Sequence, residues 1–266
     1  MRRKSTIILL LMSLFAGSCR LRPQTAATPI GEPASLIVFA AASLTDAFQE
    51  LAGPFEAAHT GVTVSFNFAG SQALRTQIEE GAQADVFASA NPKEMETLEA
   101  AGSLSGPART FATNVLTIIV APNNPAGIGS PQDLAKPGVK LVLAAEEVPA
   151  GGYARQALAN LAALYGATFP EAVLQNVVSN EDTVRQVVAK VQLGEADAGI
   201  VYATDAVARD SLGTVALPEA QNVVAEYPIA VLAESRNQRL ASEFGEFILS
   251  PEGQDILRRW GFGPPP

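Results

Sequence analysis

The sequence predicts an α/β protein with largely parallel sheets. Along the body of the chain, short apolar runs alternate with segments in which apolar residues recur at helical spacing, which is typical of successive strand–helix–strand units. The chain has 266 residues, enough for one large domain or two modest ones. Hydrophobic residues make up 48% and aromatic residues only 6%, so the core must consist mainly of Ala, Val and Leu.

The N-terminal residues have the features of an export signal. Basic residues at positions 2–4 precede an apolar stretch, residues 6–17, which is too short to span a bilayer. Small residues then lead into Cys19, the single cysteine, in a sequence that resembles a bacterial lipobox. We expect residues 1–19 to form a lipoprotein signal peptide, with Cys19 lipidated and the mature protein anchored outside the cytoplasm by lipid alone. Ordinary cleavage, giving a soluble exported protein, is the alternative.

Composition after the signal limits the choice of partner. Residues 20–33 include three prolines and predict a tether between the anchor and the folded body. The net charge is −9, and it becomes −12 when the three basic residues of the signal are removed. Such a charge argues against nucleic acid or an anionic membrane surface as the partner, because no net positive field would attract either. It does not exclude a small buried anion, which responds to local dipoles and hydrogen-bond donors.

The first part of the body contains three predicted strand–helix units. In each unit an apolar run is followed by a small or polar residue at which a helix begins. The run nearest the N-terminus is almost continuously apolar, as expected of a strand buried on both faces. The predicted strands are 36–42, 62–68 and 84–89, and the helices begin at Ser43, Ser71 and Asn91.

The second part continues the alternation. A Pro-Ala-Gly-Gly sequence at 149–152 precedes a long helix, and residues 181–183 precede another that ends at Gly194. Asp205 is expected to cap a short helix, and two helices near the C-terminus follow a late strand. The predicted strands of this part are 115–121, 139–144, 173–178, 198–202 and 227–233.

Strand-to-helix junctions are the feature that carries chemistry. The first N–H groups of a helix lack intrahelical partners and bear partial positive charge. In open α/β sheets, such junctions surround the crevice at the carboxyl ends of the strands. Several junctions together would form a neutral cage of donors for an oxyanion, although each one alone is more often a simple cap or turn. Ser43, for example, is followed by Asp46 as in a capping box.

Five segments of the chain resemble the periplasmic molybdate-binding proteins of ABC transporters. The segments match in their order and separation as well as in their residues. They are 39–45, 68–71, 81–87, 148–151 and 194–202. The resemblance implies the type II periplasmic binding protein fold, in which two α/β lobes with mostly parallel sheets are joined by a hinge. The implied lobes are 34–113 together with 226–266, and 114–225.

The resemblance also implies which residues hold the anion. In the family, serine hydroxyls, backbone amides and a tyrosine bind it without positively charged side chains. The corresponding residues here are Ser43, Ser71, Ala150, Val184 and Tyr202. Residues 180–185 depart from the shorter form of this segment that is common in the family, which makes Thr183 an alternative to Val184. Gly70 and Gln72 stand where the family commonly has serines.

The function implied is the capture of molybdate, and also of tungstate, for delivery to the membrane permease of an ABC importer. We expect a monomer with no catalytic residue, no cofactor and no metal cation, since the single His59 has no cluster of possible ligands around it. Arg75, Arg155 and Arg185 are expected to face solvent or to pair with acids.

Three other functions stay open at the level of sequence. The same fold binding sulfate or a small organic anion is the nearest. An exported hydrolase is disfavoured because the chain has no Gly-x-Ser-x-Gly sequence, no cysteine in its body and a single histidine. A structural or adhesive lipoprotein would leave the repeated strand-to-helix junctions unexplained.

Overall fold

The computed structural model describes residues 34–207, 209 and 211–266. The predicted signal peptide, Cys19 and the tether lie outside the described residues. Within the described part of the chain, no helix is long and apolar enough to cross a membrane.

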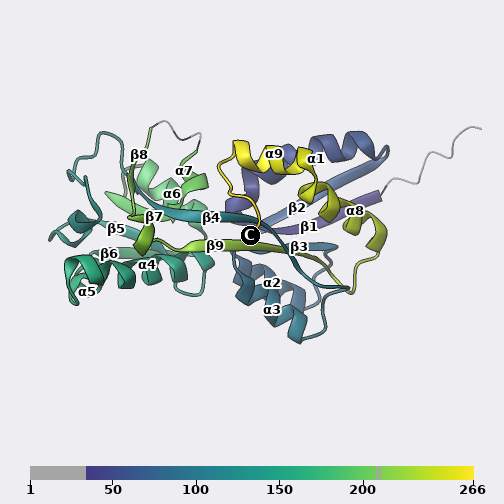
Figure 1. Cartoon of the computed structure of the whole chain (residues 1–266), viewed down its shortest axis with the longest axis horizontal. Coiled ribbons are helices and arrows are strands. Elements are labelled where there is room, and N and C mark those ends of the chain that lie inside the picture. Colours follow the sequence, from purple (N-terminus) through teal and green to yellow (C-terminus); the bar gives the residue numbers. More distant parts are fainter. Residues whose placement is uncertain (1–33, 208, 210) are drawn as a thin grey trace, which may run out of the picture. The chain divides into compact units, whose positions relative to one another are not determined.

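Strands and helices alternate through most of the chain (Figure 1). The strands are β1 Ala34–Ala41, β2 Val62–Ala69, β3 Val86–Ala88, β4 Arg109–Val120, β5 Leu141–Ala144, β6 Val177–Glu181, β7 Ala198–Tyr202, β8 Gly213–Ala216 and β9 Val224–Val231. The helices are α1 Thr45–Ala58, α2 Ser71–Glu79, α3 Pro92–Ala100, α4 Pro149–Tyr165, α5 Phe169–Leu174, α6 Val184–Gln192, α7 Ala203–Ala206, α8 Gln238–Leu249 and α9 Pro251–Arg259. Short 3-10 helices occupy Ala42–Leu44, Pro131–Ala135 and Glu219–Gln221.

The sheet has two parallel groups of strands joined by antiparallel ones. Its order is β2-β1-β3-β9-β4-β7-β5-β6, with β8 paired to β4. β1 is parallel to β2 and β3, and β5 is parallel to β6 and β7. The antiparallel pairs in the described part all include β4 or β9. The strands that helices connect are therefore parallel, as crossover connections require.

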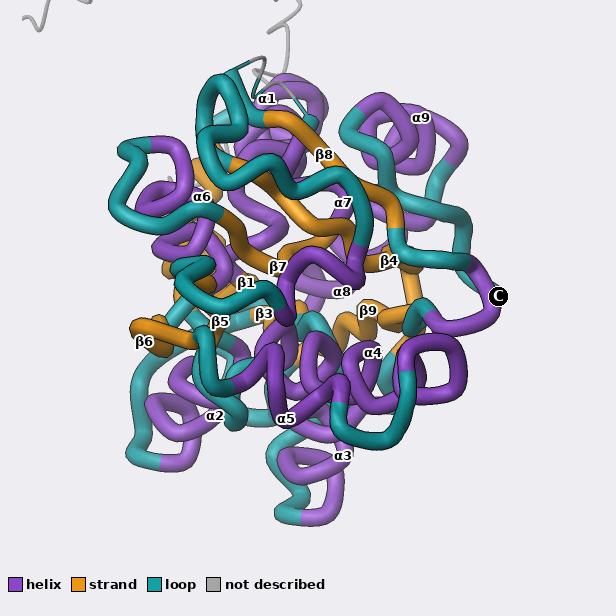
Figure 2. Tube along the Cα trace, turned by 90° about the vertical axis from the view of Figure 1, so that its left-hand side faces the viewer, coloured by secondary structure: helices purple, strands orange, loops and turns teal. Residues whose placement is uncertain are grey.

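The two crossing strands, β4 and β9, link the groups. β4 pairs with β9 through Arg109–Val115 and with β7 through Leu116–Val120, so one strand belongs to both parts of the sheet. Figure 1 shows β4 and β9 running between the two groups of strands. Figure 2 shows helices on both sides of the sheet, and in Figure 1 each group of strands has helices on both sides. This arrangement confirms the predicted fold of two α/β lobes joined by a hinge.

Buried aliphatic residues form the core, and a few aromatic rings reinforce it. Phe48 of α1 lies 5.7 Å from Phe111 of β4 and 6.2 Å from Phe244 of α8, measured between ring centroids. The tilted and edge-on contacts add to the hydrophobic stabilisation of these rings. They fix α1, and therefore the junction that precedes it, against the crossing strands.

Two sequence predictions need correction. The segment predicted as a strand at 173–178 begins as the end of α5, and the strand β6 follows at Val177–Glu181. Within the described part of the chain, β6 pairs with β5 alone and is partly exposed, so it lacks the continuous apolar run of a central strand. Asp205 is not the N-cap of α7. It is the third helical residue, and its carboxylate accepts the backbone N–H of Tyr202, the true cap, at 3.3 Å.

Candidate functional site

A small cavity lies where several helices begin, with residues of both lobes around it. Its volume is about 10 Å³. A larger hollow of about 230 Å³ lies between β9 and α8, but its residues lie away from the helix N-termini. The small cavity is lined by Ala41, Ala42, Ser43, Ala69, Gly70, Ser71, Ala90, Val148, Pro149, Ala150, Val184 and Tyr202. All five residues expected to hold the anion are among them.

Helix N-termini surround the cavity. Ser71 is the first residue of α2, Val184 is the first of α6 and Ala150 is the second of α4. Ser43 lies in the 3-10 helix that leads into α1. The backbone N–H groups at these positions cannot be satisfied within their own helices, and the helix dipoles add partial positive charge. The cavity is therefore electrostatically suited to an anion.

Ser71 presents a hydroxyl whose oxygen already has a donor. The residue is 1% exposed, and its Oγ accepts the backbone N–H of Ala90 at 3.0 Å. Gly70, not Ser71, is the N-cap of α2. Because the oxygen accepts this bond, the hydroxyl hydrogen remains available for another acceptor. Ser71 is thus a donor toward the cavity and not a helix cap.

Ser43 also differs from the capping residue that its sequence context suggests. It lies inside the 3-10 helix Ala42–Leu44, and α1 begins only at Thr45. Its Oγ lies 3.1 Å from the hydroxyl of Tyr227 on β9. Asp46 does not close a capping box with Ser43, because it pairs instead with Arg185 at 2.7 Å. The hydroxyl of Ser43 is therefore held by the core and not by its own helix.

Glycines let the chain approach itself closely at two junctions. A Cβ on Gly151 would lie 1.9 Å from the carbonyl oxygen of Ala145, so only glycine allows the first turn of α4 to pack this closely on the segment that follows β5. A Cβ on Gly70 would lie 2.9 Å from the carbonyl oxygen of Asp182, across the two lobes. These glycines serve contacts between chain segments, which the sequence could not distinguish from contacts with a ligand.

Thr183 and Val184, the alternatives predicted for one contact with the anion, have different positions at the start of α6. Thr183 is the N-cap: its Oγ1 accepts the N–H of Gln186 at 3.3 Å, and the Gln186 side chain accepts the N–H of Thr183 at 3.1 Å. This capping box occupies Thr183. Val184 lines the cavity and Thr183 does not.

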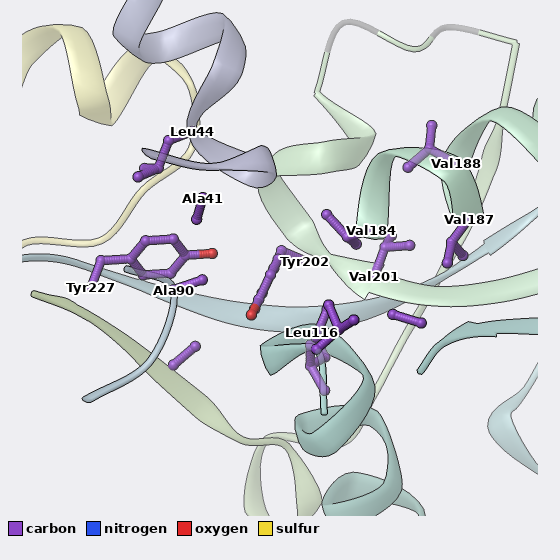
Figure 3. Close-up of a cluster of buried hydrophobic side chains, with 14 of the residues drawn as sticks. Ala41, Leu44, Ala90, Leu116, Val184, Val187, Val188, Val201, Tyr202 and Tyr227 are labelled. Carbon is purple, nitrogen blue, oxygen red and sulfur yellow. The ribbon is translucent and has the colours of Figure 1, made fainter. Parts of the chain in front are cut away.

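Tyr202 contributes a buried hydroxyl without a partner. The residue is 1% exposed, and its hydroxyl makes no hydrogen bond of normal geometry with the described residues, although the Tyr227 hydroxyl is close enough to affect its pKa. Its ring packs edge-on against Tyr227 at 5.7 Å between centroids (Figure 3). Burial raises the pKa of the Tyr202 phenol well above its usual value, so it stays protonated and can donate. A buried polar group left unpaired costs about 1–3 kcal/mol, a cost that an acceptor bound in the cavity would remove.

No charged side chain lines the cavity. Arg75 pairs with Glu94 at 2.7 Å and Arg185 with Asp46, as expected of arginines that pair with acids. Arg155 behaves differently: it donates to the carbonyl oxygens of Ala144 and Gly151, both at 2.9 Å, and so holds the end of β5 against α4. No group of three or more possible metal ligands occurs among residues 34–207, 209 and 211–266. An anion here would be held by neutral donors.

Two α/β lobes on crossing strands, with a neutral donor-lined cavity between them, define a two-lobe solute-binding protein. The chain belongs to the bacterial extracellular solute-binding protein family, whose sequence model matches residues 36–263. Solute-binding proteins are a non-enzymatic class.

Comparison with individual proteins shows which members of this family the chain is similar to. The chain is 41% identical over 232 residues to the molybdate-binding protein ModA of Mycobacterium tuberculosis, covering 87% of this chain and 85% of that one. This similarity confirms the resemblance predicted from the five segments. The periplasmic molybdate-binding protein of Azotobacter vinelandii superposes with a TM-score of 0.76 at 22% identity, covering 87% of this chain and all of the other.

A sulfate-binding protein shares the fold equally well. SubI of Mycobacterium tuberculosis superposes with a TM-score of 0.78 at 22% identity, covering 87% of each chain. At this level of identity, both structural matches establish the fold alone. The choice of anion therefore depends on the site.

Proposed function

We propose that this protein is an extracytoplasmic lipoprotein that captures molybdate between its lobes and delivers it to an ABC importer. The observation that carries the proposal is the buried hydroxyl of Tyr202, which makes no hydrogen bond with the described residues and lies in a cavity where four helical segments begin. The 41% identity to a molybdate-binding protein supports the same solute. Tungstate, with the same shape and charge, is proposed as a second ligand.

The proposed contacts are hydrogen bonds from neutral groups. Ser43 and Ser71 offer hydroxyls and backbone N–H groups, Ala150 and Val184 offer backbone N–H groups, and Tyr202 offers its phenol. Hydrogen bonds to a charged group contribute roughly 1.5–3 kcal/mol each, and a micromolar dissociation constant requires about −8 kcal/mol. A handful of these donors is therefore enough, even after desolvation of the dianion and closure of the lobes offset part of the gain.

A cage of donors selects the ionisation state of its ligand. A fully deprotonated oxyanion accepts from every donor, whereas a protonated one would direct a hydrogen at a group that cannot accept it. Discrimination between molybdate and sulfate then depends on the size of the closed cage. Sulfate remains the second candidate because SubI has the same fold.

The lobe boundaries and the anchor are part of the proposal. We place one lobe at 34–113 with 226–266 and the other at 114–225. The change of pairing partner along β4, between Val115 and Leu116, supports a boundary close to this position. Cys19 is proposed to carry the lipid that retains the protein at the membrane, where the importer permease is its partner.

A calorimetric titration of the chain without residues 1–19 tests the function. We expect molybdate and tungstate to bind with micromolar or tighter dissociation constants, and sulfate to bind at least about 100-fold more weakly. Sulfate binding of equal strength would favour the sulfate function. No binding of any tetrahedral oxyanion would reject the proposal.

A further inference from the structure

A chain of buried polar side chains connects the cavity to the crossing strands. The hydroxyl of Ser43 lies 3.1 Å from that of Tyr227 on β9. The amide nitrogen of Asn114, on β4, lies 3.4 Å from the same Tyr227 oxygen and 2.8 Å from Oγ1 of Thr204 on α7. Tyr227, Asn114 and Thr204 are all buried. This row of hydrogen-bonded side chains thus extends from one lobe, through both crossing strands, to the other.

The orientation of the Asn114 amide determines the direction of each hydrogen bond in this row of side chains. Its amide oxygen accepts the backbone N–H of Val115 at 3.0 Å, which fixes the orientation of the amide group. The NH₂ group then faces Thr204 and Tyr227, and it can only donate. The Tyr227 oxygen is therefore an acceptor for Asn114.

Tyr227 must in turn use its own hydrogen. Among the described residues, its hydroxyl makes hydrogen bonds of normal geometry with Ser43 and Asn114, whereas the nearby Tyr202 hydroxyl is not in such a bond, and Asn114 offers no acceptor there. A buried hydroxyl hydrogen without a partner is unfavourable, so the Tyr227 hydroxyl donates to Oγ of Ser43. Burial also raises the pKa of Tyr227 far above its usual range, so this hydrogen is retained.

The consequence for Ser43 is the same as for Ser71. The Ser71 oxygen accepts from the N–H of Ala90, and the Ser43 oxygen accepts from Tyr227. Each serine is left with its own hydrogen to donate. Two different hydrogen-bond donors, the Ala90 N–H and the Tyr227 hydroxyl, thus leave both serine hydroxyls of the cavity free to donate.

We propose that Tyr227 and Asn114 are positioning residues for solute binding, and that the sequence of bonds Asn114 to Tyr227 to Ser43 aims the Ser43 hydrogen at the bound oxyanion. The inference rests on the proposed function. Thr204 lies two residues after Tyr202, so the same chain of bonds also fixes the helix start that carries the phenol. One buried hydrogen-bond network on the crossing strands therefore orients donors to the oxyanion from both lobes.

A double-mutant cycle separates this role from a purely structural one. The full chain, purified in detergent, is titrated with molybdate as the unaltered protein, Tyr227→Phe, Ser43→Ala and the double variant. We expect Tyr227→Phe to weaken binding by about ten-fold and to have no further effect when Ser43 is already Ala. Tyr165→Phe, at the end of α4 and away from the cavity, is the matched control and should bind as the unaltered protein does.

A second variant tests the direction of the bonds. Asn114→Asp keeps the shape but replaces the donor with an acceptor, so the Tyr227 hydrogen turns away from Ser43. Binding should weaken in the native background and change little in the Ser43→Ala background. Thermal unfolding of every variant confirms that it is folded.

Two results would overturn the proposal in distinguishable ways. Tyr227→Phe could leave the affinity for molybdate unchanged, or weaken it as much in the Ser43→Ala background as in the native one. Either result would reject the positioning role of Tyr227 and Asn114, while the proposed function would stand. If the unaltered protein binds no molybdate, the proposed function and the positioning role of Tyr227 and Asn114 are both rejected.

Discussion

Asp46 on α1 and Arg185, the second residue of α6, form an ion pair of 2.7 Å that joins helices of the two lobes. Arg209 approaches the other oxygen of Asp46 at 3.4 Å. Arg185 follows Val184 directly, so the pair also holds the start of α6 beside the cavity. It provides a contact between the lobes that needs no ligand.

We expect Asp46→Asn to weaken molybdate binding by a few-fold. Partly exposed ion pairs contribute about 0.2–1 kcal/mol, and this one is made only when the lobes are together. Calorimetric titration measures the effect. Asp255→Asn is the control, because its pair with Arg258 lies within α9 alone and its loss should leave affinity unchanged. Equal losses in both variants would show that the Asp46 pair has no special role.

The ion pair between Asp46 and Arg185 should also make the free energy of unfolding depend on pH in the acid range. Burial opposes ionisation of Asp46, but the hydrogen bonds and charges of Arg185 and Arg209 together outweigh it, and its pKa falls below the usual 3.8. The stabilisation is therefore fully present above pH 3.8 and is lost as the pH falls through the lowered pKa. Acid unfolding followed by circular dichroism should show a smaller loss of stability in this range for Asp46→Asn than for the unaltered protein.

Asp205 should produce the opposite pH dependence. Burial raises the pKa of this carboxyl to about 7, although Arg185 and Arg209 act to lower it. Because the folded state binds a proton more tightly than the unfolded state, stability decreases as the pH rises from about 4 to about 7. Asp205→Asn should remove this decrease, with a relative gain on the order of 4 kcal/mol above pH 7. Denaturant unfolding at a series of pH values measures it, and parallel curves for the two proteins would contradict it.

Ser71→Ala should affect binding and stability together. It removes a donor to the oxyanion, which weakens binding by roughly 1–3 kcal/mol. The structure adds a second effect: the buried N–H of Ala90 loses its acceptor, so the free energy of unfolding also falls. Titration calorimetry and thermal unfolding measure the two effects. Ser65→Ala, an exposed residue of β2, is the control. Unchanged molybdate affinity would remove Ser71 from the site.

Local patterns predicted the strand-to-helix junctions, and the family resemblance selected five residues that the fold brings around one cavity. The pattern at each junction is short, because a cap and the first turn of a helix lie within a few residues. The partners that orient the site are distant in sequence. Tyr227 is 184 positions from Ser43, and Arg185 is on another lobe from Asp46. No local pattern can indicate such pairs. The alternatives Thr183 and Val184 differ by a single-residue shift of a helix start, and the sequence could not show that Thr183 is the N-cap of α6.

Tyr202→Phe provides the sharpest separation of binding from folding. The substitution removes a buried hydroxyl that has no partner among the described residues and leaves the ring contact with Tyr227 in place. In the absence of ligand, we therefore expect the thermal stability to stay the same or to rise, because an unsatisfied polar group has been removed. With molybdate, affinity should fall by about ten-fold or more, and the stabilisation by saturating ligand should shrink with it. Thermal unfolding with and without molybdate measures both quantities on one sample. A loss of stability without ligand would mean that the hydroxyl serves the fold, whereas unchanged affinity would mean that the cavity does not use it.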